Sequence, residues 1–160
     1  MSKQQLNCSI EIVNDMSSLI SSLVNNEDTL QYLSELHQYP EGMPIEMCYA
    51  IKHNNTPVGF VCLRNIRWFN RKAELTIYVK NNFRRKGIAH QAIRQMVNRS
   101  FNELNLHRLE AEIIAYNQPA IQLFGQFGFK EEGRLREAKY FNGTYHDILR
   151  FALLKKEWIA

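Results

Sequence analysis

Apolar residues recur along the chain with two different periods, and each period indicates a different kind of element. Between Ile88 and Leu104 they repeat at the spacing of one face of an α-helix. Between Ala73 and Val79 they alternate in part with polar residues, and β-forming residues are frequent, as is typical of a strand. Both kinds of stretch occur several times, so the pattern predicts a mixed α/β domain.

Applied to the whole chain, these criteria predict the order β-α-α-β-β-β-α-β-α-β-β, with antiparallel strands early and helical crossovers later. The expected strands are Ile10–Val13, Met47–Lys52, Pro57–Ile66, Ala73–Val79, Arg108–Ala115, Phe129–Phe141 and Tyr145–Leu154. The expected helices are Met16–Val24, Leu30–Leu36, the segment from Ile88 to Leu104, and Gln118–Phe127. No repeat, low-complexity tract or linker interrupts the pattern, so we expect residues 1–160 to form a single domain.

Local signals mark where the later elements begin and end. Asn117 is a natural N-cap for the helix that follows it, and Pro119 is tolerated at an early helical position. Gly128 is expected to end that helix. Asn142-Gly143, which lies between two expected strands, is a strong hairpin signal.

The composition of the chain indicates the class of protein and the cellular compartment. The chain has 160 residues, of which 45% are hydrophobic and 22% charged, and these are ordinary globular values. No apolar run approaches the roughly 20 residues that span a bilayer, and Met1 to Asn7 lacks the apolar stretch of a secretory signal. Cys8, Cys48 and Cys62 form no CxxC pair. We therefore expect a cytoplasmic protein with reduced thiols, no disulfide framework, no zinc or other metal site and no membrane partner.

Charge is distributed unevenly along the chain. From Ser9 to Glu46 there are seven acidic residues and no Lys or Arg. From Arg64 to Arg108 there are eleven Lys and Arg against two Glu, a surplus of nine positive charges. One interpretation is a set of solvated faces. The other is an anion site in the middle segment and a surface that faces cations in the first.

The sequence Arg84-Arg85-Lys86-Gly87-Ile88-Ala89 joins an expected strand to an expected helix. The first turn of a helix has unpaired N–H groups and a partial positive charge, and Gly87 lets an anion approach the backbone closely. Such a loop suits a pyrophosphate. It lacks the Gly-Lys-Ser/Thr of a Walker loop and the three glycines of a dinucleotide fingerprint. A solvated basic patch is the ordinary alternative.

This loop, read as Arg84-x-x-Gly87-x-Ala89 after Ile77-Tyr78-Val79, resembles the acetyl-CoA motif of the GNAT superfamily of N-acetyltransferases. A second stretch that matches is Asn117-x-x-Ala120-x-x-Leu123-Phe124-x-x-x-Gly128-Phe129. The segment Glu132 to Glu137, followed by Asn142-Gly143 and Asp147, resembles the branch with ribosomal-protein N-terminal, polyamine and amino-sugar acetyltransferases. The resemblance implies a central twisted mixed sheet of six to seven strands with about four helices.

The resemblance also implies how acetyl-CoA, the cosubstrate, is held. The backbone of Ile77, Tyr78 and Val79 is expected to pair with the pantetheine arm, and a strand N–H to polarise the acetyl carbonyl. Asn117 is expected to bond near the pantetheine or the acceptor, although helix capping alone is the plain alternative. The pyrophosphate is expected on the backbone amides of Arg84, Arg85, Lys86, Gly87, Ile88, Ala89 and His90.

Two carboxylates are candidates for the general base. An amine with a pKa near ~10.4 must lose a proton before it attacks an acetyl group. Glu112 lies five residues before Asn117, where ribosomal-protein acetyltransferases of the family carry their base. Glu74 lies on the strand where other members place a glutamate. A surface or salt-bridged glutamate is the ordinary alternative for each.

Phe124 departs from the family pattern, because many members carry at this position a tyrosine that protonates the departing thiolate. A CoA-type thiol has a pKa near ~8.5, so its thiolate is a tolerable leaving group unaided. Water, Tyr116, Tyr140 or Tyr145 are substitutes to consider, although packing is the ordinary role of such tyrosines. The departure leaves the general acid open.

The resemblance and the charge pattern together predict an N-acetyltransferase that transfers the acetyl group directly to a primary amine. The acidic first segment favours a cationic acceptor: a polyamine, an amino sugar or aminoglycoside, or a peptide N-terminus. Trp68, Phe69, Tyr140 and Phe141 are candidates to line its pocket, with core or hairpin packing as the alternative. A non-catalytic acyl-CoA-binding sensor and a toxin acting on aminoacyl-tRNA are the rival functions. Nucleic acid is not an expected partner, and a homodimer remains open.

Overall fold

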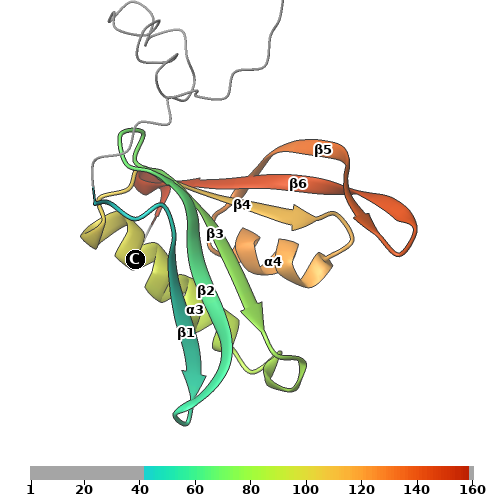
Figure 1. Cartoon of the computed structure of the whole chain (residues 1–160), viewed down its shortest axis with the longest axis horizontal. Helices are drawn as coiled ribbons and strands as arrows, with labels where there is room; N and C mark the ends of the chain where they lie inside the picture. The colour runs from blue at the N-terminus through green and yellow to red at the C-terminus, as the bar shows by residue number, and fades with distance from the viewer. Residues whose placement is uncertain (1–41, 159–160) are drawn as a thin grey trace, which may run out of the picture. The chain divides into compact units, whose positions relative to one another are not determined.

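Six strands form one mixed sheet in the order β1-β2-β3-β4-β6-β5 (Figure 1). The structure is a computed structural model that describes residues 42–158. The strands are β1 (Met47–His53), β2 (Thr56–Arg67), β3 (Lys72–Val79), β4 (Arg108–Ile114), β5 (Lys130–Phe141) and β6 (Thr144–Leu154). The helices are α3 (Ile88–Asn98) and α4 (Gln118–Gln126), with helical turns η1 (Asn81–Phe83), η2 (Arg99–Glu103) and η3 (Lys155–Glu157).

The eight elements expected from Met47 onward are confirmed in type and order. The expected segments Ile10–Val13, Met16–Val24 and Leu30–Leu36 lie outside the described residues, and a single domain over residues 1–160 therefore stays an expectation. The described residues belong to one unit that runs from Tyr39 to Ala160. Within residues 42–158, neither helix has the length and apolar character needed to cross a membrane.

The helix expected to reach Leu104 changes its winding before that point. It is α-helical to Asn98 and continues as the π-helical turn η2, in which the Leu104 N–H donates to the Arg99 carbonyl at 3.0 Å. The hydroxyl of the fully buried Ser100 donates to the Met96 carbonyl at 2.7 Å. A serine that bonds back to the preceding turn commonly bends a helix, which accounts for the local change.

The sheet has two parts, β1-β2-β3 and β4-β6-β5, which are joined by a short pairing between β3 and β4. These parallel strands pair from Lys72 with Arg108 to Glu74 with Glu110. Beyond that point β3 continues beside β2, whereas β4 continues beside β6, and the two strands separate (Figure 1). The two parallel strands therefore diverge, and the wedge between them opens toward their C-terminal ends.

The two faces of the sheet have different chemistry. Side chains alternate along each strand, so residues two apart share a face. On β3 and β4, Leu75, Leu109 and Ala111 are buried in the core, against which α3 packs Ile93 and Val97. The opposite face carries the intervening side chains, which on these two strands include Glu74, Glu110 and Glu112.

The residues expected to begin and end the later elements have the conformations that the sequence predicts. The Asn117 side-chain oxygen accepts from the Ala120 N–H at 3.4 Å and caps α4. Gly128, after the helix, has a φ of +84°. Asn142 and Gly143 have φ angles of +49° and +78°, as a type I′ turn between β5 and β6 requires.

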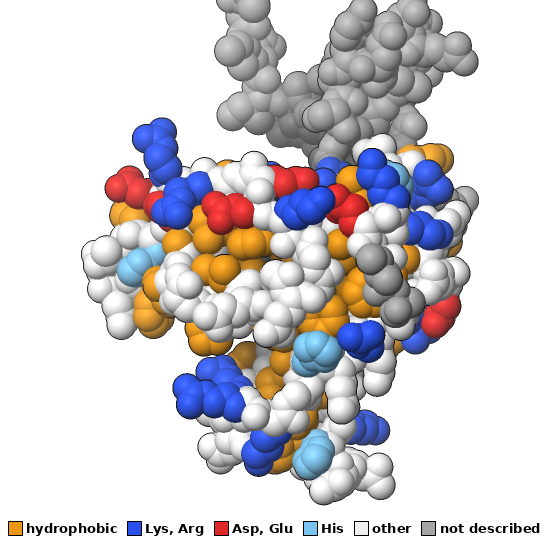
Figure 2. Space-filling model, turned by 180° about the vertical axis from the view of Figure 1, so that it is seen from behind, with side chains coloured by type: hydrophobic (Ala, Val, Ile, Leu, Met, Phe, Trp, Pro, Cys, Tyr) orange, Lys and Arg blue, Asp and Glu red, His pale blue; other side chains and the backbone are white. Residues whose placement is uncertain are grey.

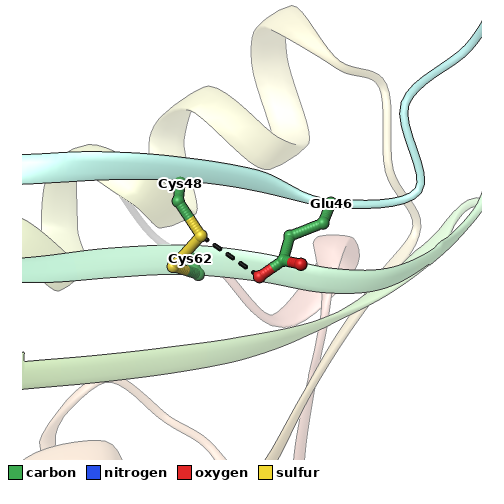
Figure 3. Close-up of side chains that lie close together, drawn as sticks. All are labelled: Glu46, Cys48 and Cys62. Atoms are coloured by element: carbon green, nitrogen blue, oxygen red, sulfur yellow. Dashed lines mark hydrogen bonds between the residues drawn. A yellow bond between two sulfur atoms is a disulfide. The ribbon is translucent and has the colours of Figure 1, made fainter.

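The expectation of reduced thiols is wrong for two of the three cysteines. Cys48 of β1 and Cys62 of β2 form a disulfide (Figure 3). The antiparallel register places the two residues directly opposite each other, with their Cα atoms 4.1 Å apart. Spacing along the chain gave no sign of this pairing, because the contact depends on the register of two strands.

A bulge in β5 is held by one carboxylate of β6. The register between the strands shifts between Leu135 and Lys139, and Glu137 in this interval has a φ of +53°. Asp147 accepts from the Glu137 backbone N–H at 2.9 Å and from the Arg134 guanidinium at 3.0 Å. These two donors, the backbone N–H first, hold the pKa of Asp147 below its ordinary value.

This lowered pKa predicts a pH-dependent contribution to stability. Ionised Asp147 stabilises the fold above its ordinary pKa of 3.8, and the contribution is lost as the pH falls through the lower native value. We expect Asp147→Asn to lower the melting temperature near neutral pH, with a difference from wild type that shrinks below about pH 4. Circular dichroism melts across this range measure the effect, with Glu131→Gln on β5, the partner strand, as control. A difference that stays constant into acid would contradict the assignment.

Candidate active site

The loop that follows β3 presents backbone N–H groups beside positive charge. After η1 the chain turns through Arg85 and Gly87, whose φ angles are +60° and +76°. Gly87 is the N-cap of α3 and has no side chain with which to cap the first helical turn. The N–H groups of that turn therefore remain for an external acceptor, and the helix dipole adds partial positive charge. This arrangement suits a bound anion.

The three basic side chains of the loop have different roles. Arg84 donates from Nε to the Val79 carbonyl at 2.9 Å, so it ties the loop to the end of β3. Arg85 and Lys86 are exposed, and the Lys86 ammonium lies 5.2 Å from the centre of the Phe83 ring. Seen from behind, Lys and Arg side chains gather at the lower end of the molecule without Asp or Glu beside them (Figure 2).

The structure places every residue expected at the pyrophosphate on this loop or on the first turn of α3. Ile88 and Ala89 are half-buried and pack against the core. The ring of His90 lies 4.5 Å from that of Phe127. The packing of these side chains holds the first turn of α3 in place. The backbone N–H groups of that turn point away from the helix, toward the loop. Binding of a phosphate here stays a prediction.

The last residues of β3 present a strand edge to the wedge. Ile77 is half-buried, Tyr78 is 46% exposed and Val79 is buried. Pairing of β3 with β4 ends at Glu74, so within the described residues no strand covers this edge beyond that point. An extended chain such as a pantetheine arm has the shape to pair with it.

Asn117 lies where β4 passes into α4, at the other side of the wedge. Its side-chain oxygen is committed to the helix cap, which was the plain alternative expected from the sequence. The cap leaves the side-chain N–H₂ as the group for any bond to a cofactor or acceptor. That second role stays a prediction.

The two candidate bases lie in the same cavity. Glu74 and Glu112 both line a space of about 180 Å³ on the sheet face that carries the charged side chains. Glu112 accepts from Arg150 Nε at 3.0 Å, and Glu74 accepts from Asn65 Nδ2 at 3.1 Å. Glu112 lies beyond the last β3–β4 pair, in the diverging part of the wedge, whereas Glu74 belongs to that last pair.

The cavity also contains charged residues that the sequence analysis missed. Arg108 donates from Nε to Glu110 at 2.7 Å and forms a bidentate ion pair with Glu132. The hydrogen bonds that Arg108 donates to Glu132 hold the pKa of Glu132 below its ordinary value and raise the pKa of Arg108. Alternation along β4 was the available signal for Glu110, since it lies two residues from Glu112. Glu132 and Arg150 depend on the register of β5 and β6, which the sequence does not reveal.

The side chain at position 124 cannot supply a proton. Phe124 is buried, 4% exposed, and its ring packs edge to face against Phe129 at 5.0 Å. Among the substitutes, Tyr116 is 54% exposed and packs against the ring of His146 at 4.9 Å. Tyr140 and Tyr145 pack against each other at 5.0 Å on the β5–β6 hairpin. Their packing agrees with the ordinary alternative for these two residues.

The candidate aromatic residues of the acceptor pocket are not brought together at the cavity. Trp68 packs against the core and donates from its indole nitrogen to the Pro44 carbonyl at 2.8 Å. Phe69 is 72% exposed, and Tyr140 and Phe141 lie at the end of β5. None of these four side chains lines the cavity of Glu74 and Glu112.

The features described so far match a known family. Residues 14–129 match the Acetyltransferase (GNAT) family. This match covers well over half of the chain, and the diverging strands and the basic loop before α3 lie within it. The chain therefore belongs to the GNAT family of acetyltransferases.

Individual relatives carry more specific names. The chain is 36% identical to the putative ribosomal N-acetyltransferase YdaF of Bacillus subtilis (strain 168) over 109 residues. This aligned stretch is 68% of this chain and 60% of that protein. It is 33% identical to the spermidine N(1)-acetyltransferase of Vibrio cholerae serotype O1 over 102 residues. This aligned stretch is 64% of this chain and 59% of that protein. The chain thus spans about three fifths of the length of these two relatives.

Solved structures support the same fold. The crystal structure of a probable acetyltransferase superposes with a TM-score of 0.68 and 32% identity, over 71% of this chain and 64% of that one. The dodecameric structure of spermidine N-acetyltransferase from Vibrio cholerae superposes with a TM-score of 0.68 and 31% identity, over 71% of this chain and 67% of that one. The fold expected from the resemblance is confirmed, with six strands and two α-helices in the described residues.

Proposed function

We propose that this chain transfers the acetyl group of acetyl-CoA directly to a primary amine, and that the acceptor is cationic. Membership of the acetyltransferase family is the observation that carries this proposal. The wedge between β3 and β4, open beside a basic loop at the start of a helix, supports it independently.

Acetyl-CoA would lie along the edge of β3, with its pantetheine arm beside Ile77 to Val79 and its pyrophosphate at the first turn of α3. Gly87 leaves that turn uncapped, and the exposed Arg85 and Lys86 supply formal positive charge. The acetyl group would then lie in the wedge, where an N–H of β3 can stabilise the oxyanion that forms during attack.

Glu112 is our choice for the group that accepts the amine proton. It lies on β4 beyond the last β3–β4 pair, next to the part of the wedge where the acetyl group and the amine would meet. Arg150 holds its carboxylate in one orientation through the 3.0 Å bond. Proton transfer can run through one water molecule, which the cavity has room to hold. Glu74 then contributes charge to the same cavity.

The leaving thiolate has no tyrosine at position 124 to protonate it. Because a CoA-type thiol has a pKa near ~8.5, its thiolate is a stable enough leaving group for the reaction to proceed, and water can supply the proton afterwards. Tyr116 directly precedes Asn117 in the sequence, so among the described residues its hydroxyl is a candidate to supply this proton.

The charge of the cavity supports a cationic acceptor. Its lining contains four glutamates and two arginines, a surplus of two negative charges: Glu74, Glu110, Glu112, Glu132, Arg108 and Arg150. An ammonium group brings the opposite charge into this space, and electrostatic attraction favours it over a neutral or acidic amine. One relative is named a spermidine N(1)-acetyltransferase, and spermidine is a polyamine, which is one of the cationic acceptors proposed for this chain.

A thiol-release assay tests the proposal. Purified protein is mixed with acetyl-CoA and, in turn, with polyamines, aminoglycosides, amino sugars, basic peptides, and an acidic peptide as control. We expect release with at least one cationic amine and at least tenfold less with the acidic peptide, a difference of about 1.4 kcal/mol. Equal rates with all amines would contradict the cationic acceptor. CoA binding without any release would favour the sensor, which the apolar Phe124 makes the second candidate.

The cytoplasmic location and the absence of a nucleic-acid partner remain predictions, and whether the chain forms a homodimer stays open. A dodecamer has been described for the Vibrio cholerae spermidine N-acetyltransferase, and association of this chain with further copies is consistent with that relative.

A further inference from the structure

We propose that Cys48, Cys62 and Glu46, when the disulfide is reduced, form a binding site for a thiophilic divalent metal ion such as Zn²⁺. Glu46 directly precedes β1, Cys48 lies near the start of β1 and Cys62 lies in the middle of β2, and the three side chains point toward one another (Figure 3). One ligand atom from each, the two Sγ atoms and a carboxylate oxygen, lies within 4.8 Å of the others. The Glu46 carboxylate is 3.2 Å from Cys48 Sγ.

The spacing of these atoms fits one ion. Zn–S bonds of about 2.3 Å and Zn–O bonds of about 2.0–2.2 Å place the ligands of one tetrahedral ion roughly 3.5–4 Å apart. Reduction lets the sulfur atoms separate toward this distance without moving the strands, because the side chains already face each other. Two thiolates with one carboxylate favour a borderline-soft ion over Mg²⁺ or Ca²⁺, and water would complete the tetrahedron.

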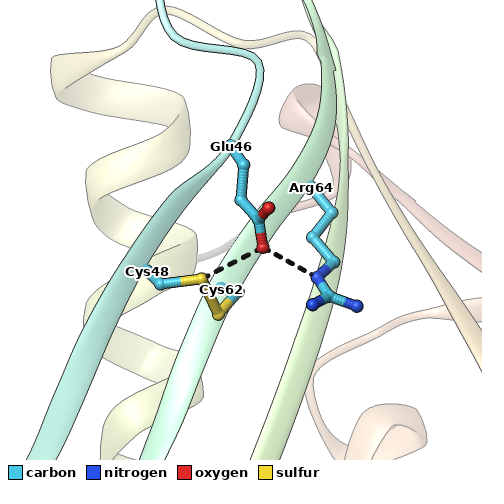
Figure 4. Close-up of a disulfide and its surroundings, with 4 residues drawn as sticks. All are labelled: Glu46, Cys48, Cys62 and Arg64. Carbon is cyan, nitrogen blue, oxygen red and sulfur yellow. Dashed lines mark hydrogen bonds and ion pairs between the residues drawn. A yellow bond between two sulfur atoms is a disulfide. The ribbon is translucent and has the colours of Figure 1, made fainter.

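Arg64 gives the site its charge balance and holds one of its ligands. Its Nε donates to the same Glu46 oxygen at 2.9 Å, from the side away from the sulfur atoms (Figure 4). Two thiolates and one carboxylate around a divalent ion leave one negative charge, which the guanidinium neutralises. Carboxylates that bind metals are commonly held in this way by an outer hydrogen bond.

A metal ion can reach the site from solvent, and the site lies apart from the cavity of Glu74 and Glu112. Cys48 is exposed, whereas Cys62 is only 2% exposed, so an ion would enter from the side of Cys48. Arg64 lies opposite Glu74 in the register of β2 and β3. The site therefore lies on the same sheet face as the cavity described above, one strand away from it, and does not share its residues.

The chemistry that opens the site balances in two steps. A dithiol reductant transfers two electrons and two protons to the Cys48–Cys62 bond, which gives two thiols, while the reductant becomes a disulfide. The metal ion then displaces the two thiol protons and forms two metal–sulfur bonds. Affinity therefore falls at low pH, where protons compete for the thiolates.

Cobalt(II) is a suitable probe, because its tetrahedral thiolate complexes absorb strongly in the near ultraviolet. We expect the full-length protein, reduced and kept under nitrogen, to bind one equivalent with a thiolate-to-cobalt band that Zn²⁺ abolishes. Protein oxidised with diamide should show no band. Cys48→Ser and Cys62→Ser should each weaken the band and the affinity, Arg64→Gln should weaken the affinity about 10–100-fold, and Cys8→Ser should change neither.

A measurement on the unsubstituted protein guards against variants that fail to fold. Zn²⁺ should slow alkylation of Cys48 by iodoacetamide in the reduced protein, as read by peptide mass spectrometry. The proposal is overturned if reduced protein shows no thiolate-to-cobalt band, if Zn²⁺ leaves the alkylation rate of Cys48 unchanged, or if the band persists in Cys48→Ser and disappears in Cys8→Ser. These readouts do not use acetyl transfer, so they stand apart from the proposed function.

Discussion

Replacing Glu112 with Gln is expected to lower kcat for acetyl transfer by about 10²–10³-fold, while the KM for acetyl-CoA stays close to wild type. Gln keeps the size of the side chain and an oxygen that can accept from Arg150, but it cannot take a proton from the amine. The KM is expected to be unaffected because Glu112 belongs to β4, whereas the proposed cofactor contacts come from β3 and the loop before α3. Steady-state thiol release with the best acceptor measures both constants.

Glu74→Gln is the matched control for this experiment. Glu74 lines the same cavity and also accepts one hydrogen bond from a neighbouring side chain, that of Asn65. We expect its loss in kcat to stay within about tenfold, since it supplies charge without accepting the proton. A larger loss for Glu74→Gln than for Glu112→Gln would reverse the assignment of the base. Urea midpoints equal to that of wild type for both variants would show that neither effect comes from unfolding.

Gly59→Ala is expected to have the largest effect on stability, a loss of about 3 kcal/mol of unfolding free energy. A Cβ at this position of β2 would lie 2.1 Å from the Tyr78 carbonyl oxygen, and 3.1 Å from the Tyr78 carbonyl carbon and from the Val79 Cα. All three are backbone atoms of β3, which cannot move aside as a flexible side chain can. Urea denaturation followed by circular dichroism measures the change.

Gly125→Ala provides the matched control, because a Cβ there meets no atom within 4 Å. Gly125 lies in α4, where alanine has the higher helix propensity, so we expect unchanged stability or a gain of up to about 1 kcal/mol. Wild-type stability of Gly59→Ala would show that β3 can shift away from β2. In that case a raised KM for acetyl-CoA would follow, because the shift displaces Tyr78 and Val79.

Sequence reasoning worked best where information is local. The helical spacing after Ile88, the Asn117 cap, the Gly128 end signal and the Asn142-Gly143 turn each depend on a few neighbouring residues, and each is confirmed. The family motifs are also local, since they describe a loop and the helix that follows it. They placed Glu74 and Glu112 as candidate bases, and the structure brings both into one cavity.

Features that depend on strand register could not be predicted in the same way. The Cys48–Cys62 disulfide, the Arg150–Glu112 ion pair and the contact of Gly59 with β3 all join residues on different strands. A shift of one residue would turn the cysteine, arginine and glutamate side chains to the opposite face and would move Gly59 away from its place opposite Val79, and no sequence pattern fixes the register that closely. The change from α-helix to π-helical turn at Arg99 was also missed, although the bond that accompanies it, from the buried Ser100 hydroxyl to the Met96 carbonyl, joins residues only four apart.

The short seam between β3 and β4 has a thermodynamic consequence. Three residue pairs join these strands, whereas seven join β4 to β6, so the backbone of the sheet is least connected where the cofactor is proposed to bind. A pantetheine arm paired with β3 would complete this part of the sheet and would bind the folded chain alone. At a hundredfold excess over its Kd, such a ligand adds about 2.7 kcal/mol to the unfolding free energy. The supply of acetyl-CoA would then set the fraction of the chain that escapes proteolysis, as well as the rate of its reaction.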